Sequence, residues 1–367
     1  MKKYTLPPYP ATEDVWDRLK RETRPLVVYG MGNGGDKMTL QLQRRGLSVA
    51  DYMASDGFVR GHSFHGKRVL SLAEVTEKYG EFVLLLSFAS SRPEVLAMLW
   101  EIADKYPLLM PDLPVVGDLC FDKEYYNEHY AELAGVYGLL ADDTSRNLYA
   151  ATLHYKLTGD IRILRDAATD REEELSLLSV GEIRSYVDGG AYRGDTLAEL
   201  LSHGAPLKEA VCVEPDRKNL EKLKNYGSTL TNVNVRCIWG ALWDTAGEAC
   251  FSASGNRNAS LVGASYEHRA QTTPLLRLDD LCEGLFPDYV KYDVEGAERQ
   301  ALLGSALTVS RARPRLLVSL YHRTEDLWVL PRLVEKMCPA YDFYIRRVAG
   351  VPAWDLNLIC IPRKESP

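Results

Sequence analysis

Short apolar runs alternate with amphipathic segments in two stretches of this 367-residue chain, residues 26–106 and residues 183–362. A short apolar run bounded by turn residues is typical of a buried strand, and apolar residues repeated every three or four positions are typical of a helix. Strands that alternate with helices favour parallel sheets with helices on their faces. The pattern therefore predicts an α/β protein with two Rossmann-like domains.

The first stretch follows a polar lead-in rich in proline, in which one helix is expected over 13–22. A strand at 26–29 runs into a glycine-rich turn, and a helix follows this turn. Further along, the same alternation continues to the end of the stretch. We expect strands at 47–52, 69–72 and 82–87, and helices at 36–45, up to Tyr79 and at 93–106.

Residues 121–182 change to helical periodicity and contain no clear strand pattern. Helices are expected at 122–133 and at 144–157, the second after a capping run Asp-Asp-Thr-Ser. The many tyrosines here are expected to pack between helices with their hydroxyls at the rim. We therefore divide the chain into a Rossmann-like N-terminal domain at 1–119, a helical connector at 120–182 and a second α/β domain at 183–367.

The second α/β stretch opens with a strand from Ser185, a glycine turn and a helix that begins at Asp195 or Thr196. It closes with two strands, 341–348 and 357–361, which are expected to form an antiparallel hairpin. Between these ends we expect strands at 209–213, 233–238, 289–292 and 315–320, and helices at 216–226, 297–307 and 325–337.

The N-terminal glycine turn matches the GxGxxG pattern of dinucleotide-binding domains. Gly30, Gly32 and Gly35 follow a strand and precede a helix, and Asp56 comes near the place of a ribose-binding carboxylate. The turn either holds a nucleotide or nucleotide-sugar, or is vestigial in a domain kept for substrate positioning or dimer contacts. The sequence of this domain shows no His, Lys or Tyr arrangement that would complete a dehydrogenase.

The C-terminal glycine turn has a carboxylate at its start and a second one at the end of the following strand. Asp188 precedes Gly189 and Gly190, in a turn that lets the backbone approach a nucleotide-like cofactor closely. Glu214 lies 20 residues beyond Gly194. A carboxylate at this place can bind both hydroxyls of a ribose, so the sequence predicts a nucleoside site here.

Two later strands carry polar side chains to what should be the same edge of the sheet. Asp293 and Glu295 follow the strand at 289–292, which we expect to lie beside the first strand, where open sheets bind ligands. His322 follows the strand at 315–320, and an imidazole with a pKa near neutrality can act as a general base. These three side chains could hold a divalent ion, but their spacing does not demand one, and we expect no metal.

A polar loop at 255–260 interrupts the alternation of strands and helices. It could hold hydroxyl or phosphate groups of a substrate, or be a surface excursion without a ligand. The candidate substrate contacts are Asn256, Asn258, Ser260 and Tyr321.

Composition and charge exclude several classes of function. A net charge of −7 argues against broad binding to nucleic acid or to anionic membranes. The longest apolar run, residues 82–88, is far too short to span a bilayer. Seven cysteines without CxxC pairs give no zinc signature. With no secretory segment at the start of the chain, they favour reduced thiols and a cytoplasmic location.

Three motifs, in this order and spacing, resemble those of the FkbM-type S-adenosylmethionine-dependent methyltransferases. They are Val-Asp-Gly-Gly-Ala-Tyr-Arg-Gly-Asp-Thr at 187–196, Val-Glu-Pro-Asp at 213–216 and Lys-Tyr-Asp-Val-Glu-Gly-Ala-Glu at 291–298. The similarity covers about half of the chain, from residue 183 to residue 362, and the preceding helical part resembles longer members with an extra N-terminal domain. Two departures are Gly189, where Val or Ile is commoner, and Tyr321, where many members have an acidic residue.

The resemblance implies a class I methyltransferase-like sheet with a closing antiparallel hairpin, S-adenosylmethionine as cofactor, and methyl transfer to a hydroxyl of a sugar or another small molecule. It implies a small sugar-like partner, neither nucleic acid nor a membrane span, and a homodimer is one expectation. The first candidate base is His322, with Glu295 and Asp293 as alternatives. The implied cofactor contacts are Asp188, Gly189, Gly190, Ala191, Thr196, Glu214, Ala241 and Asp293.

Two other functions stay open at this point. The first is an NAD-dependent oxidoreductase that modifies a sugar through the N-terminal turn at 30–35, but it needs a proton-relay residue that the domain does not offer. The second is a non-catalytic binding protein with a degenerate methyltransferase fold. It predicts that residues of the cofactor motif are lost, whereas Asp188, Glu214 and Asp293 are all present.

Overall fold

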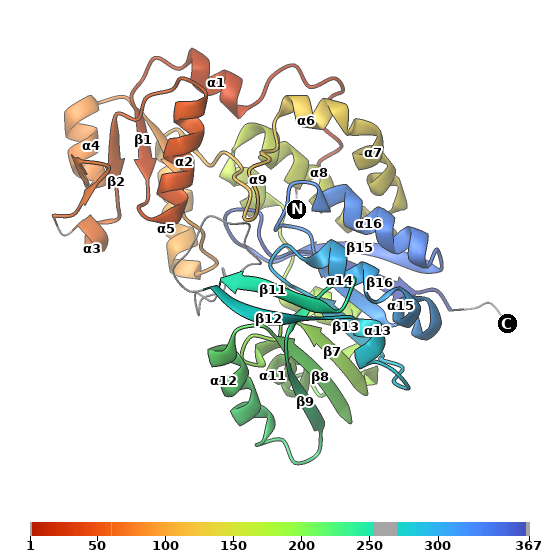
Figure 1. Cartoon of the computed structure of the whole chain (residues 1–367). Coiled ribbons are helices and arrows are strands. Elements are labelled where there is room, and N and C mark those ends of the chain that lie inside the picture. The colour runs from red at the N-terminus through yellow and green to blue at the C-terminus, as the bar shows by residue number, and fades with distance from the viewer. Residues whose placement is uncertain (1, 60, 253–269, 365–367) are drawn as a thin grey trace.

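A computed structural model describes residues 2–59, 61–252 and 270–364 of the chain (Figure 1). The N-terminal domain contains a four-stranded parallel sheet in the order β2-β1-β5-β6. The predicted strand at 69–72 is reduced to one parallel bridge between Met53 and Leu70. The elements are α1 (Val15–Arg21), β1 (Leu26–Tyr29), α2 (Asn33–Arg44), β2 (Asp51–Met53), α3 (Asp56–Val59), β3 (Ser63–Phe64), β4 (Lys67–Arg68), α4 (Leu72–Tyr79), β5 (Val83–Leu86), α5 (Pro93–Lys105) and β6 (Leu108–Leu109).

Helices form the next part of the chain, as the periodicity predicts. The expected helix at 122–133 is divided at His129, and Asp142 caps the long helix by accepting a hydrogen bond from the Ser145 amide at 2.7 Å. That helix, α8, packs against strand β15 of the second sheet, so this part of the chain is joined to the C-terminal domain. The elements are α6 (Lys123–Glu128), α7 (Tyr130–Leu139), α8 (Asp143–Thr158), α9 (Ile161–Asp166), α10 (Arg171–Leu177) and the 3-10 turn η1 (Val180–Glu182).

The C-terminal domain is built on a seven-stranded sheet in the order β15-β16-β14-β13-β7-β8-β9. The strands are parallel except β16, which runs antiparallel to both of its neighbours and gives the predicted closing hairpin. The fold class predicted from the sequence is confirmed. The strands of this sheet are β7 (Ser185–Gly189), β8 (Glu209–Glu214), β9 (Asn234–Trp239), β13 (Tyr289–Tyr292), β14 (Arg315–Ser319), β15 (Tyr341–Arg347) and β16 (Leu356–Pro362).

Alternate residues of this sheet pack on opposite faces, as expected of buried strands. Val187, Val211 and Val290 belong to a cluster with α7, α8 and α16, while Tyr186 and Tyr289 belong to a cluster with α10, α11 and α12. The expected helix at 297–307 is interrupted at Gly304, where a Cβ would lie 2.0 Å from the Trp243 carbonyl oxygen. The helices are α11 (Asp195–Ser202), α12 (Arg217–Gly227), α13 (Leu278–Leu281), α14 (Glu298–Leu303), α15 (Ala306–Ala312) and α16 (Asp326–Met337).

A small separate sheet follows the third strand of the large one. It contains β10 (Ala241–Leu242), β11 (Gly247–Ser252) and β12 (Ala270–Leu276), with β11 and β12 antiparallel. The predicted substrate loop at 255–260 lies outside the described residues. Within the described parts of the chain, none of the helices is long and apolar enough to cross a bilayer.

Candidate active site

The carboxyl ends of four neighbouring strands, β7, β8, β13 and β14, open into one cavity of about 750 Å³. The strand order changes direction here, which is where open α/β sheets bind ligands. Asp188, Gly189, Ala191 and His322 are buried and do not line the cavity. The predicted site residues that line it are Gly190, Thr196, Glu214, Ala241, Asp293, Glu295 and Tyr321.

The glycine turn after β7 allows two backbone segments to touch. Gly190 has φ +81°, and a Cβ on it would lie 2.0 Å from the carbonyl oxygen of Asp293. Since Asp293 follows the adjacent strand β13, this close approach brings the ends of β7 and β13 together. Any side chain at Gly190 would push them apart.

Glu214 ends β8 and lies at one end of the cavity, 6% exposed. Its carboxylate accepts hydrogen bonds from the amides of Tyr192 at 2.8 Å and Asp216 at 2.9 Å. Burial raises the pKa of Glu214 to about 7. The two amides fix the orientation of the carboxylate, and its other lone pairs can accept hydrogen bonds from a ligand.

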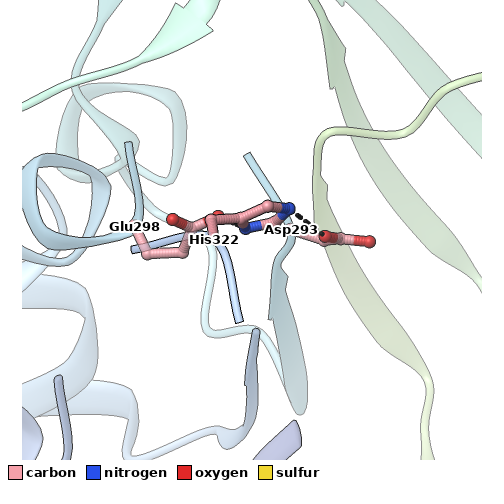
Figure 2. A group of neighbouring side chains, drawn as sticks. All are labelled: Asp293, Glu298 and His322. Carbon is pink, nitrogen blue, oxygen red and sulfur yellow. Dashed lines mark ion pairs between the residues drawn. The ribbon is translucent and has the colours of Figure 1, made fainter. Parts of the chain in front are cut away.

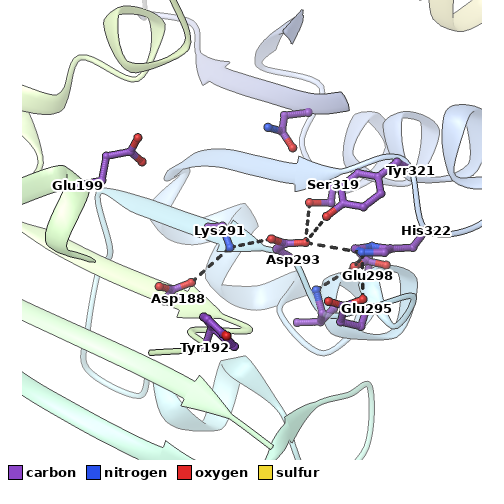
Figure 3. A network of polar contacts seen from close by, with 12 residues as sticks. Asp188, Tyr192, Glu199, Lys291, Asp293, Glu295, Glu298, Ser319, Tyr321 and His322 are labelled. Carbon is purple, nitrogen blue, oxygen red and sulfur yellow. Dashed lines mark hydrogen bonds and ion pairs between the residues drawn. The ribbon is translucent and has the colours of Figure 1, made fainter. Parts of the chain in front are cut away.

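A chain of charged groups crosses the floor of the site from β7 to β14 (Figure 3). The ammonium group of Lys291 lies 3.8 Å from Asp188 and 3.1 Å from Asp293. Burial raises the pKa of Asp188 to about 6, against the opposing effect of Lys291. Both Asp188 carboxylate oxygens are buried and have no hydrogen-bond donor in the described part of the chain.

Asp293 is the centre of this network. It accepts hydrogen bonds from the hydroxyls of Ser319 at 3.0 Å and Tyr321 at 3.2 Å. Burial opposes its ionisation, but the charges of Lys291 and His322 and these hydrogen bonds outweigh burial and hold the pKa of Asp293 well below its ordinary value. Asp293 is therefore a fixed negative charge at the cavity wall.

His322 lies behind this wall, 1% exposed, among three carboxylates. Its Nδ1 is 2.9 Å from Glu298, and its Nε2 is 3.5 Å from Glu295 and 3.8 Å from Asp293. Burial alone would lower the pKa of His322, but Glu298, Asp293 and Glu295 raise it to about 10. The imidazole is therefore a cation at neutral pH.

Asp293, Glu298 and His322 form the group whose spacing suits a metal ion, with ligand atoms within 4.8 Å of one another (Figure 2). A metal needs a neutral imidazole as its ligand. In the structure the group forms a buried ion-pair cluster, in which the neighbouring carboxylates raise the pKa of His322. A metal ion bound here would displace protons from the imidazole.

Within this cluster, Glu295 lines the cavity and has a pKa close to neutral pH. Burial raises the pKa of Glu295 to about 8, against the attraction of His322. Its backbone has φ +54°, a conformation that costs energy for a residue other than glycine. The next residue, Gly296, has φ +91° and packs against Val116. This turn projects the Glu295 carboxyl group into the cavity.

The family model described as the methyltransferase FkbM domain matches residues 188–345, which span this site. The C-terminal domain belongs to the FkbM methyltransferase family. A crystal structure of methyltransferase FkbM from Methylobacillus flagellatus is similar over 98% of this chain and 94% of that chain, with TM-score 0.69 and 19% identity. No curated protein matches the chain.

Two other solved methyltransferases resemble about half of the chain. Precorrin-6y C5,15-methyltransferase from Geobacter metallireducens covers 53% of this chain and 90% of its own, with TM-score 0.34 and 11% identity. Aeropyrum pernix fibrillarin with bound S-adenosyl-L-methionine covers 51% of this chain and 74% of its own, with TM-score 0.33 and 13% identity.

At the N-terminal glycine turn, Gly34 and Gly30 pack against Ser87 at the end of β5, while Gly32 and Asn33 are exposed. A Cβ on Gly34 would lie 1.7 Å from the carbonyl oxygen of Ser87, and one on Gly30 would lie 2.6 Å from the Ser87 hydroxyl. Gly35 packs against the ring of Phe64. Asp56 begins α3, and no residue of the turn lines the 750 Å³ cavity.

Three members of the FkbM site network were not predicted from the sequence: Lys291, Glu298 and Ser319. Lys291 had a usable signal, since a lysine inside a buried four-residue strand demands a buried partner. Glu298 had one too, because it follows Asp293 and Glu295 as the third acid within six residues. Ser319 carries no signal that separates it from other strand serines.

Proposed function

We propose that the FkbM domain transfers a methyl group from S-adenosylmethionine to a hydroxyl oxygen of a small, sugar-like acceptor. One observation carries this proposal: a single cavity is lined at once by Glu214, suited to a ribose, and by Glu295, suited to accept a proton. Methyl transfer from a sulfonium is an in-line displacement, so it needs alignment and a proton acceptor rather than covalent catalysis.

The residues present fit this cofactor. Glu214 is oriented by two amides and can accept hydrogen bonds from the ribose hydroxyls. Asp293, which lines the cavity, offers negative charge for the methionine end, which carries an ammonium group and a sulfonium. Asp188 lies behind the lining and contributes through Lys291, 3.8 Å away. When bound, the cofactor supplies a methyl carbon on a positively charged sulfur.

We assign the base to Glu295 and move His322 to a positioning role. Glu295 lines the cavity and has a pKa of about 8, whereas His322 is buried and already protonated. The imidazolium lies 3.5 Å from Glu295 and stabilises its carboxylate form, which accepts the proton. His322 is therefore required for the reaction although it does not contact the acceptor.

The proton and electron balance of the step is simple. With S-adenosylmethionine held by Glu214, the acceptor oxygen would bond to the methyl carbon while the bond from that carbon to sulfur would break and leave its electron pair on sulfur. The acceptor proton passes to Glu295 and then to solvent. Asp293, held ionised by Lys291, keeps negative charge beside the reacting centre throughout.

The redox function does not gain support, because no residue of the N-terminal glycine turn lines the cavity that holds Glu214 and Glu295. A degenerate binding protein does not gain support either, since Glu214, Asp293 and Glu295 are all oriented in one cavity.

Calorimetric titration with S-adenosylmethionine and, separately, with NAD tests the proposed function. We expect S-adenosylmethionine to bind and NAD not to bind. Glu214→Ala should weaken the binding of S-adenosylmethionine by about tenfold to a hundredfold, since it removes charged hydrogen bonds to the ribose. Asp36→Ala, at an exposed residue of the N-terminal helix α2, is the matched control and should bind as the wild type does. Absence of binding by the wild type would refute the proposal.

A further inference from the structure

The cavity of the FkbM domain has a wall that comes from the other domain. Ala89, Ser90 and Ser91, in the loop between β5 and α5, line the same cavity as Glu214 and Glu295. This loop is tied to the C-terminal hairpin, because Ser90 and Val351 exchange two backbone hydrogen bonds of 2.8 and 3.0 Å.

The hairpin side of this junction is held rigidly as well. Arg347, 1% exposed, donates hydrogen bonds to the carbonyl oxygens of Ala167 at 2.7 Å and Gly350 at 3.3 Å. The segment that receives Ser90 is therefore fixed to the helices that precede the FkbM domain, and the wall is part of the folded structure.

The loop between β5 and α5 packs against the N-terminal glycine turn. Ser87 rests on Gly34 and Gly30, at the carboxyl ends of β1 and β5, where a ligand would bind in an open sheet. The close contacts leave no room for a Cβ at either glycine. Gly30 and Gly34 are thus explained by the approach of the loop, whose next residues reach the cavity.

Aromatic side chains lie on the C-terminal side of the same cavity. The rings of Tyr321 and Trp354 are stacked, with centroids 6.3 Å apart and an angle of 29° between planes. Tyr321 also donates its hydroxyl hydrogen to Asp293. A ring with an apolar face and hydroxyls at its edge suits this combination of aromatic faces and polar groups.

The charges of the described lining residues disfavour an anionic acceptor. Among the residues that the structure describes, two cationic side chains line the cavity, Arg171 and Lys291. Arg171 donates to Glu199 at 2.6 and 2.9 Å, and Lys291 is paired with Asp293, so both charges are engaged. The acidic lining residues are Asp195, Glu199, Glu214, Asp293, Glu295 and Asp355. A phosphate brought into this lining would lose its hydration without gaining a cation.

We propose that the loop at 87–92 is the acceptor-side wall of the methyltransferase site. The site takes an uncharged, unphosphorylated ring that carries hydroxyls. Ser90, Ser91 and Trp354 decide which ring fits. The inference rests on the proposed function and deepens it. It gives the N-terminal domain a role in substrate selection that requires no second nucleotide.

The test is binding, measured by saturation-transfer NMR on the full chain with S-adenosylhomocysteine bound. The probes are methyl glycosides and inositols, each paired with its phosphorylated counterpart. We expect uncharged members to bind and their phosphates to bind at least about tenfold more weakly. Ser91→Trp, at an exposed wall residue, should weaken the binding of the glycoside at least about tenfold, because the indole fills part of the cavity. Ser48→Trp, exposed in the same domain but away from the cavity, is the matched control.

The outcomes separate this inference from the proposed function. Calorimetric binding of S-adenosylhomocysteine should be equal in the wild type, Ser91→Trp and Ser48→Trp. If the wild type fails to bind it, the proposed function fails. If it binds, the inference is overturned when no uncharged probe binds, when phosphates bind as well as their parents, or when Ser91→Trp binds glycosides as tightly as Ser48→Trp.

Discussion

The two glycine turns of this chain follow the same local pattern and end in different surroundings. Each turn joins the first strand of a parallel sheet to a helix, and each contains a glycine that no other residue could replace. At Gly34 the neighbour is the backbone of Ser87, at the end of β5, and the turn lies outside the 750 Å³ cavity. At Gly190 the neighbour is the backbone of Asp293, and the turn still lines the large cavity. A glycine pattern therefore shows close approach, and only the rest of the fold shows what approaches.

The largest expected effect concerns the chemistry beside the C-terminal turn. Glu295→Gln keeps the shape of the side chain and removes the proton acceptor, so kcat should fall by about 10²- to 10⁴-fold. Calorimetry should show unchanged affinity for S-adenosylhomocysteine. Steady-state kinetics with an acceptor found in the binding screen checks the loss, and a kcat within about twofold of wild type would remove Glu295 as the base.

Matched substitutions in the two turns compare them directly. Gly190→Ala and Gly34→Ala each place a methyl group within 2.0 and 1.7 Å of a backbone oxygen, so both should lower stability by about 1–3 kcal/mol. Only Gly190→Ala should weaken the binding of S-adenosylhomocysteine, by about tenfold or more. Thermal unfolding and calorimetry measure the two quantities. Equal losses of cofactor affinity in both variants would break the comparison.

The pH dependence of kcat sharpens the assignment of the base. The carboxylate form of Glu295 accepts the proton, so kcat should rise with pH up to about 8, by about tenfold per unit well below that value. It should then stay level up to about pH 10, where His322 loses its charge. A pH–rate profile measures both limits. The rise should be absent in Glu295→Gln, and a rise centred near pH 10 would instead favour a neutral His322 as the base.

The smallest expected effect follows removal of divalent metal. Because the protonated His322 already lies between Asp293 and Glu298, EDTA should leave kcat and cofactor affinity unchanged, and added Mg²⁺ should not raise them. Activity measured after dialysis against EDTA checks this. Loss of activity that Mg²⁺ restores would show that this cluster holds a metal.

Most of the fold could be predicted from the sequence because buried strands and turn glycines are local signals. The strands that end at Gly189, Glu214 and Tyr292 were predicted, and parallel pairing brings their ends together. The division of the helix at Gly304 was missed, since it depends on the approach of Trp243, sixty-one positions earlier in the chain.

The candidate site was predicted less completely, for the same reason. The polar residues that end strands could be named in advance, but their exposure could not. The structure places His322 behind the wall and Glu295 in the cavity, and this decides which of them can reach an acceptor. The contribution of Ser90 and Ser91 depends on how two domains meet, which no local pattern in the sequence records.

A crystal structure with S-adenosylhomocysteine tests most directly the claim that only the C-terminal turn binds a ligand. The account predicts density for the ligand between Gly190 and Glu214, with the ribose on the Glu214 carboxylate and the sulfur toward Glu295, and the loop of Ser87 still seated on Gly34. Density for the ligand at Gly30 to Gly35, with the Ser87 loop displaced, would contradict it.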